Sequence, residues 1–236
     1  MNKTYKINLK SDAFNNYRCK RACDSLDIDI QKKLEHKFEI EFDIEKNFNI
    51  GLIYGNSGSG KTTLAKHIFG NNIFDTIIDE NNCILNQLNE KYDYQECVNI
   101  LNAIGLNSVP CWIRPIKTLS NGQKARAEIA YLLTNEKNKI IVIDEFTSVV
   151  DRIAAKAMAI CIKKFANKYN KKIILLSCHN DIIEYLNPDW IIDCNKQSYT
   201  EHPIDTDFFL CQKKNLYSTL KKSTEKHGDI LANIII

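Results

Sequence analysis

The segment Gly55–Thr62, GNSGSGKT, constrains the fold of this chain more than any other feature. It fits the pattern G-x-x-x-x-G-K-[ST] at every fixed position. An apolar run, Phe48–Gly55, comes before it, and a helical pattern, Leu64–Phe69, comes after it. In such a loop, glycines let backbone N–H groups surround a phosphate at the positive end of a helix. The sequence therefore predicts a site for a nucleoside triphosphate.

The residues of this loop are expected to share the work of binding ATP. The Lys61 ammonium is placed to reach the β- and γ-phosphates and to assist catalysis, and the Thr62 hydroxyl is placed to bind Mg²⁺. The predicted nucleotide-binding residues of the segment are Gly55, Asn56, Ser57, Gly58, Ser59, Gly60, Lys61, Thr62 and Thr63.

A second apolar run, IIVIDE at Ile140–Glu145, ends in two acidic residues. Asp144 would lie at the carboxyl end of a buried strand, beside the phosphate loop, and hold Mg²⁺ through water. Glu145 would then be placed to polarise the attacking water as general base. ATP and Mg²⁺ are thus the expected cofactors.

Predicted strands alternate with predicted helices along the chain. This alternation indicates an α/β fold, a P-loop NTPase with a mainly parallel central sheet covered on both faces. The prolines of SVPCWIRPI, Ser108–Ile116, predict an irregular connection. Strands are expected at 38–44, 48–55, 75–79, 139–144 and 171–178, and helices at 64–69, 94–105, 120–133 and 151–169.

A second glycine-containing turn, TLSNGQKAR at Thr118–Arg126, opens one of these helices. Ser120 is a good N-cap residue, which is its simplest role. The run also resembles the L-S-G-G-Q signature of ABC-type ATPases, with Asn121 replacing one glycine. Its position between the phosphate loop and IIVIDE makes the resemblance specific. The resemblance implies that Ser120, Gly122 and Gln123 bind the ATP held by another copy, in a head-to-tail homodimer.

Two further segments fall where the ABC resemblance requires them. TSVVD at Thr147–Asp151 resembles the D-loop, which implies that Asp151 contributes to the composite nucleotide site and contacts the other copy. His179 follows the next buried strand, 35 residues after Asp144, and resembles the switch histidine that senses the γ-phosphate.

The chain departs from the family's transporter subunits in its middle segment. Lys61 and Ser120 are 59 residues apart, fewer than in those subunits, which implies a shortened helical subdomain. The Q-loop position is open between Asp79, Gln87 and Gln95. No sustained heptad pattern suggests the long coiled coils of the chromosome-maintenance relatives.

The residue that would stack on adenine is also open. Tyr17 and Phe14 are candidates by type, and a core position explains them equally well.

DEFTSVVDR at Asp144–Arg152, with its neighbouring motifs, resembles a stand-alone ABC subgroup of phages and prokaryotes. Some members of that subgroup are fused to an acetyltransferase-like domain. The resemblance covers roughly 10–195, so we expect an ABC-type ATPase domain at 1–195 and a C-terminal extension at 196–236. The extension is too short to be an acetyltransferase.

Composition excludes some classes of function. The formal net charge is +3, which excludes a strongly basic nucleic-acid protein but leaves a local patch open. Lys163–Lys172 is the candidate patch, and a solvated helix face explains it better. No signal-peptide pattern or membrane-spanning run is visible, so we expect a cytoplasmic protein without a transmembrane segment, whose nine cysteines are reduced.

The leading functional interpretation is a soluble ATPase that hydrolyses ATP to switch a cytosolic protein partner. That partner could belong to a nucleic-acid-processing or DNA-modifying system. The alternative is the ATP-binding subunit of a membrane ABC transporter. A module that holds ATP without hydrolysing it is disfavoured by Glu145.

Overall fold

The computed structural model describes residues 3–10, 16–25, 35–42, 48–70, 78–135, 139–146, 148 and 150–201. Several sequence predictions lie outside these residues. They concern Phe14, Thr147, most of the strand expected at 75–79 and most of the C-terminal extension.

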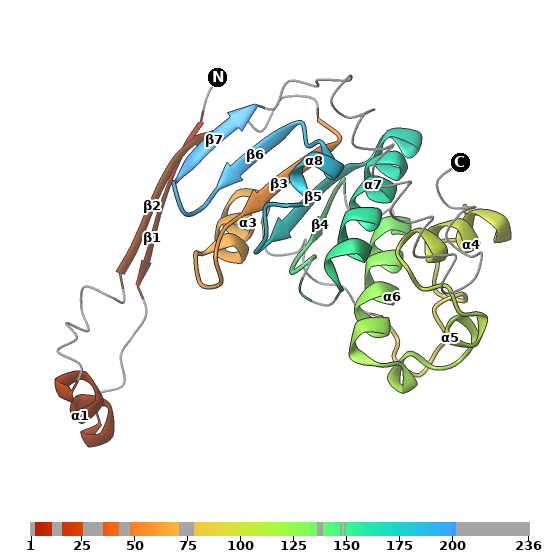
Figure 1. Cartoon of the computed structure of the whole chain (residues 1–236), viewed down its shortest axis with the longest axis horizontal. Helices are drawn as coiled ribbons and strands as arrows, with labels where there is room; N and C mark the ends of the chain where they lie inside the picture. The colour runs from red at the N-terminus through yellow and green to blue at the C-terminus, as the bar shows by residue number, and fades with distance from the viewer. Residues whose placement is uncertain are drawn as a thin grey trace.

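A five-stranded sheet forms the centre of the described chain (Figure 1). Its order is β4–β5–β3–β6–β7, and β4, β5, β3 and β6 are parallel while β7 is antiparallel to β6. The mainly parallel α/β fold predicted from the sequence is confirmed. The strands are β3 (Ile50–Tyr54), β4 (Ile140–Ile143), β5 (Lys172–Ser177), β6 (Trp190–Asp193) and β7 (Ser198–Glu201).

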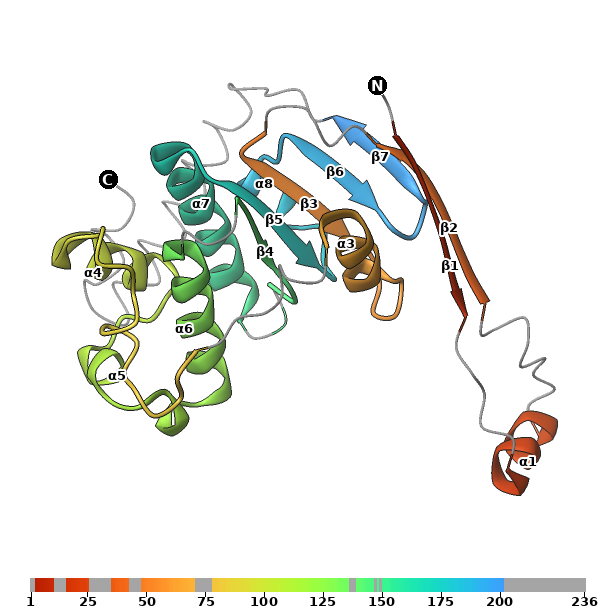
Figure 2. The ribbon, with the colours of Figure 1, turned by 180° about the vertical axis from the view of Figure 1, so that it is seen from behind.

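Helices cover both faces of this sheet, as a buried parallel sheet requires (Figure 2). Alternate residues of the strands point to opposite faces: Leu52 and Leu175 pack against the group that contains α4, α6, α7 and α8, whereas Ile53 and Leu176 pack against α3. The helices are α3 (Lys61–Phe69), α4 (Tyr94–Ala103), α6 (Asn121–Thr134), α7 (Arg152–Tyr169) and α8 (Ile183–Leu186).

Local sequence sets the ends of the helices. Asp93 and Glu96 form a capping box at the start of α4, and Gly105 follows its end with φ 79°. Asp151 caps α7, and Asn170 ends it in the left-handed region with φ 50°. These ends fall within a few residues of the predicted ones.

The connection between α4 and α6 is more regular than its prolines predicted. It contains the short helix α5 (Val109–Ile113) and a 3₁₀ turn, η2 (Ile116–Thr118). The prediction of an irregular connection was wrong for α5, because Pro110 occupies the first turn, where a missing N–H removes no helical hydrogen bond. The indole N–H of Trp112 donates to the carbonyl of Leu106 at 2.5 Å and fixes this segment.

The N-terminal part contains β1 (Lys3–Lys10) and α1 (Tyr17–Ser25), which the sequence pattern did not predict. β1 pairs antiparallel with β2 (Glu35–Phe42) in a separate two-stranded sheet, and α1 lies away from the central sheet (Figure 1). α1 has no buried residue, so no apolar stripe facing a core marked it in the sequence. At the other end, β7 extends the central sheet past residue 195, and the domain boundary there stays a prediction.

Candidate nucleotide-binding site

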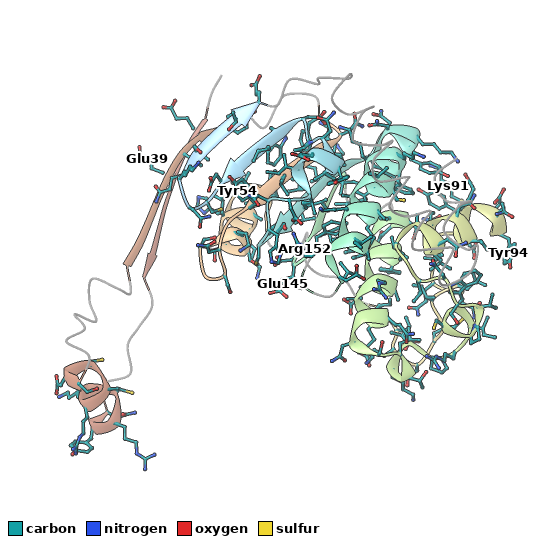
Figure 3. All side chains as sticks on the ribbon, in the orientation of Figure 1. Glu39, Tyr54, Lys91, Tyr94, Glu145 and Arg152 are labelled. Carbon is teal, nitrogen blue, oxygen red and sulfur yellow. The ribbon has the colours of Figure 1, made fainter. Side chains whose placement is uncertain are left out.

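The carboxyl ends of three neighbouring parallel strands gather the predicted nucleotide residues. β5 lies between β3 and β4, so the phosphate loop after β3, Asp144 and Glu145 after β4, and His179 after β5 share one edge of the sheet. In Figure 3, Glu145 and Arg152 lie at this edge. Ligands of open parallel sheets bind at the carboxyl ends of the strands.

The phosphate loop takes a conformation that needs its glycines. Gly58 and Gly60 have φ of 79° and 86°, in the left-handed region. A Cβ on Gly55 would lie 2.5 Å from Ser59 Oγ and 2.9 Å from Cys194 Cβ, so the loop closes tightly at its base. Asn56, Ser57 and Gly58 are exposed at the tip of the loop. Thr63 is also exposed, on the first turn of α3.

Lys61 lies beneath the loop, although lysine is rarely buried. Its side chain belongs to a residue only 8% exposed, and its ammonium donates to the carbonyls of Gly55 and Asn56 at 2.8 Å each. The backbone thus holds a positive charge at the opening of α3, where anions are favoured.

Thr62 and Asp144, which are far apart in sequence, meet at the mouth of the loop. The Thr62 hydroxyl donates to Asp144 Oδ2 at 2.7 Å. Among the described residues, no cluster of three or more His, Cys, Asp or Glu side chains could hold a metal ion. A hydroxyl and one carboxylate nevertheless fit Mg²⁺, which keeps several waters and binds substrate phosphates. These two oxygens are the donor set that would hold it.

Glu145 has an unusual backbone for a non-glycine residue, with φ 48°. Its amide donates to Asp144 Oδ1 at 2.8 Å, and the Ser148 hydroxyl donates to its carbonyl, also at 2.8 Å. The same hydroxyl lies 3.3 Å from Glu145 Oε2. Such left-handed residues cost about 1–3 kcal/mol and often occur at active sites. Glu145 is exposed, so water can reach its carboxylate.

His179 lies on an exposed turn that Ser177 organises. The Ser177 hydroxyl accepts from the His179 amide at 3.0 Å and donates to its carbonyl at 2.8 Å. The carbonyl of Ser177 in turn accepts from the Gly55 amide at 3.2 Å, which ties this turn to the phosphate loop.

The turn between β6 and β7 supports the loop, and the sequence analysis did not identify it. Asn195 Oδ1 accepts from the Asn56 amide at 3.1 Å, and Asp193 Oδ1 accepts from the Asn195 amide at 2.9 Å. Asp193 Oδ2 accepts from the Tyr54 hydroxyl at 2.6 Å. Burial, followed by this contact with Asp193, raises the pKa of Tyr54 to about 12. The apolar run WIIDC, which includes an acidic residue, was the available signal.

The predicted signature residues are arranged as a helix start. Ser120 and Gln123 form a capping box: the Gln123 amide donates to Ser120 Oγ at 3.4 Å and the Ser120 amide donates to Gln123 Oε1 at 3.1 Å. Ser120 is exposed, and Gly122 is half-buried on the first turn of α6. α6 and α3 lie apart in Figures 1 and 2. Within one chain the segment is therefore separate from the phosphate loop, as action on another copy would require.

Asp151, the last predicted site residue, caps the start of α7. Its Oδ1 accepts from the amides of Ile153 and Ala154 at 3.0 and 2.9 Å. Asp151 is exposed, which leaves it accessible to a second copy.

Two of the three Q-loop candidates, Gln87 and Gln95, form hydrogen bonds within their own segments. Gln87 Oε1 accepts from the Asp79 amide at 2.7 Å, while its Nε2 donates to the carbonyls of Asp79 and Cys83, so Gln87 fixes a local turn. Gln95 donates to Asn99 Oδ1 on the surface of α4. Of the adenine candidates, Tyr17 lies on α1, away from the sheet (Figure 1).

Lys163–Lys172 does not present a row of unengaged charges. Lys163 pairs with Asp189 at 3.2 Å, Lys168 with Glu96 at 3.7 Å, and Lys172 lies over the ring of Phe48. This pattern favours the helix-face explanation over a nucleic-acid contact.

No family model matches the chain. It is 28% identical over 189 residues to YydI of Bacillus subtilis (strain 168), named a probable peptide export ATP-binding protein, covering 69% of this chain and 88% of YydI. It is 29% identical over 128 residues to p29 of Mesomycoplasma hyorhinis, named a probable ABC transporter ATP-binding protein, covering 53% of this chain and half of p29.

A solved ABC transporter of the metal-chelate type, in an inward-facing conformation, shares the fold. The match has a TM-score of 0.51 at 18% identity and covers 72% of this chain and 77% of that one. The names of the two relatives agree with the ABC-type resemblance of the motifs, and the solved structure shows a shared fold. None of the described helices is both long and apolar enough to cross a membrane.

Proposed function

We propose that this chain is an ATPase of the ABC type that binds ATP with Mg²⁺, pairs head to tail with a second copy, and hydrolyses ATP. The observation that carries the proposal is the 2.7 Å contact of Thr62 with Asp144 at the mouth of a glycine loop. It brings together the two oxygen donors that an ATP-bound Mg²⁺ needs. Glu145 follows on the same strand end.

The residues of the site divide the reaction between them. The loop amides and Lys61 would bind the phosphates, and Thr62 and Asp144 would hold Mg²⁺, which neutralises charge on the phosphate oxygens. Glu145 would accept a proton from the attacking water, and its exposed carboxylate supports that role. His179, on the neighbouring strand end, would contact the γ-phosphate.

The second copy would complete each site. Ser120, Gly122 and Gln123 begin a helix whose positive end suits a γ-phosphate, and they are separate from the phosphate loop of their own chain. Asp151 would lie at the contact between the copies. Loss of the γ-phosphate on hydrolysis would remove the ligand that joins the two, so the pair would open.

Two partners for this switch have support. The short segment between Lys61 and Ser120 favours a cytosolic protein, with a nucleic-acid-processing or DNA-modifying system as one class. The names of the two relatives favour a membrane transporter. Val109 and Ile113, 51% and 64% exposed on α5, offer apolar surface that either partner could cover.

Hydrolysis is tested with Glu145→Gln, with the exposed Glu90→Gln as control. We expect the first variant to bind ATP as the parent does but to lose hydrolysis by at least about 10²-fold, because it lacks the general base. The control should match the parent. Equal hydrolysis by Glu145→Gln and the parent would refute the catalytic assignment.

The partner is tested by capture from native cells with tagged Glu145→Gln protein, trapped by ATP and Mg²⁺. An integral membrane protein that is captured only in the presence of ATP would support the transporter. A soluble enzyme that is captured only in the presence of ATP would support the cytosolic switch. Lys61→Ala protein serves as the control for contacts that do not need ATP.

A further inference from the structure

We propose that Arg152 and Asp181 form a positioning pair that joins the start of α7 to the turn bearing His179. Contact with a second copy at Asp151 would thereby be coupled to the residue that senses the γ-phosphate. The inference rests on the proposed function and adds two residues to which the sequence analysis gave no role.

The pair is an ion pair with one hydrogen bond. Arg152 Nε donates to Asp181 Oδ2 at 3.0 Å, and Arg152 Nη2 contacts Asp181 Oδ1. The charge-assisted Nε–Oδ2 bond holds the guanidinium against the carboxylate. The two side chains are 40% and 35% exposed, so the pair is partly withdrawn from solvent. It therefore restrains geometry better than a fully exposed pair.

A second contact lies one helical turn further along both segments. The Lys156 ammonium lies over the ring of Tyr185 at 5.1 Å. Lys156 follows Arg152 by four residues and Tyr185 follows Asp181 by four, so the contacts form a ladder between α7 and α8. Ile182, fully buried, packs in the same hydrophobic cluster as α7. The segment after His179 is thus fastened to the first two turns of α7.

His179 lies on a very short span between two fixed points. Ser177, at the end of β5, holds the backbone of His179 through its hydroxyl. Asp181 holds the other side through Arg152. Only residues 178–180 lie between these anchors. A shift of the first turn of α7 would therefore also move His179, because the connecting segment is too short to absorb it.

The other anchor adjoins the contact expected with the second copy. Arg152 directly follows Asp151, whose side chain caps α7. Displacement of Asp151 by a partner would act on Arg152 through the same rigid helix start. The geometry makes the pair the short route between the expected interface and His179. Figure 3 labels Arg152, which lies near Glu145.

The test compares Asp181→Asn with Lys168→Gln, which removes a more exposed ion pair at the far end of α7. We expect Asp181→Asn to lower kcat by about 10- to 100-fold, since small misplacements near reacting groups cost this much. ATP affinity should stay within about twofold of the parent, because no loop contact changes. Lys168→Gln should leave both values unchanged.

A double-mutant cycle separates positioning from general stability. In a His179→Ala background, measured by single turnover, Asp181→Asn should cause no further loss, because its effect passes through His179. Arg152→Lys should lower kcat less than Asp181→Asn, because it keeps the positive charge and loses only the Nε donor. If Asp181→Asn folds poorly, Arg152→Lys takes its place and is compared with and without His179 in the same way.

Three results would overturn the inference. They are an unchanged kcat in Asp181→Asn, an equal loss with and without His179, or a fall in ATP affinity that accounts for the whole effect. If the parent chain does not hydrolyse ATP at all, the proposed function fails instead, and the two failures are distinguishable.

Discussion

Removal of the Asp193 carboxylate should destabilise the fold and weaken nucleotide binding together. This side chain belongs to a residue 6% exposed and accepts from the Tyr54 hydroxyl at 2.6 Å and from the amides of Asn195 and Lys196 at 2.9 and 3.2 Å. Asn195 in turn holds the Asn56 amide in the phosphate loop. Asp193→Ala therefore removes the support of the loop without touching the loop itself.

The magnitude follows from these contacts. In Asp193→Ala the part-buried Tyr54 hydroxyl would lose this acceptor, which costs about 1–3 kcal/mol of stability. The amides of Asn195 and Lys196 would bond to water in place of the carboxylate, which costs about 1 kcal/mol for the two together. We expect Asp193→Ala to lower the free energy of unfolding by about 2–4 kcal/mol. Tyr54→Phe removes only the first bond and should cost about 1 kcal/mol.

The assay is urea denaturation of the two variants beside the parent, followed by titration with an ATP analogue. Asp193→Ala should bind the analogue about tenfold more weakly, the equivalent of about 1.4 kcal/mol of lost support. Tyr54→Phe, which leaves Asn195 in place, should bind it normally. Equal stability losses in the two variants, or normal affinity in Asp193→Ala, would refute the reasoning.

Three further results are expected. The pKa of Tyr54 is about 12 in the fold against 10.0 as its ordinary value, so its contribution to stability is full below pH 10 and lost toward pH 12; pH-dependent unfolding should show that loss, and Tyr54→Phe should remove it. Gly51→Ala would place a Cβ 2.0 Å from the Trp190 ring, and unfolding curves should show a loss of about 1–3 kcal/mol or more that Trp190→Leu partly relieves. Burial raises the pKa of Cys161 to about 11 and of Cys194 to about 12, so mass spectrometry after iodoacetamide treatment at about pH 8 should find both unlabelled until the chain unfolds.

The sequence was most informative where local chemistry is strict. Positive φ at Gly58 and Gly60 and the apolar runs into Gly55 and Asp144 follow from rules on backbone freedom and strand burial. These rules predicted the phosphate loop, the strands β3, β4 and β5, and the helices α3, α4, α6 and α7.

Contacts between segments that lie far apart in the sequence could not be predicted from its local patterns. β6 and β7 belong to the sheet because β6 pairs with β3, a register that no local period contains. The support of Asn56 by Asn195 and the pairing of Arg152 with Asp181 likewise depend on which segments meet in space. Short strands and single polar contacts give too little periodic signal for prediction.

The central claim, a composite site shared by two copies, is tested most directly by mixing two inactive variants. Lys61→Ala lacks the phosphate-binding lysine, and Gly122→Asp places a negative charge where the other copy's γ-phosphate would lie. The account predicts that each variant alone is inactive. An equal mixture should regain about a quarter of the parent's activity, because about half the dimers are mixed and each mixed dimer has one intact site. A mixture that forms dimers with ATP but stays inactive would contradict the account, as would Gly122→Asp protein that hydrolyses ATP normally on its own.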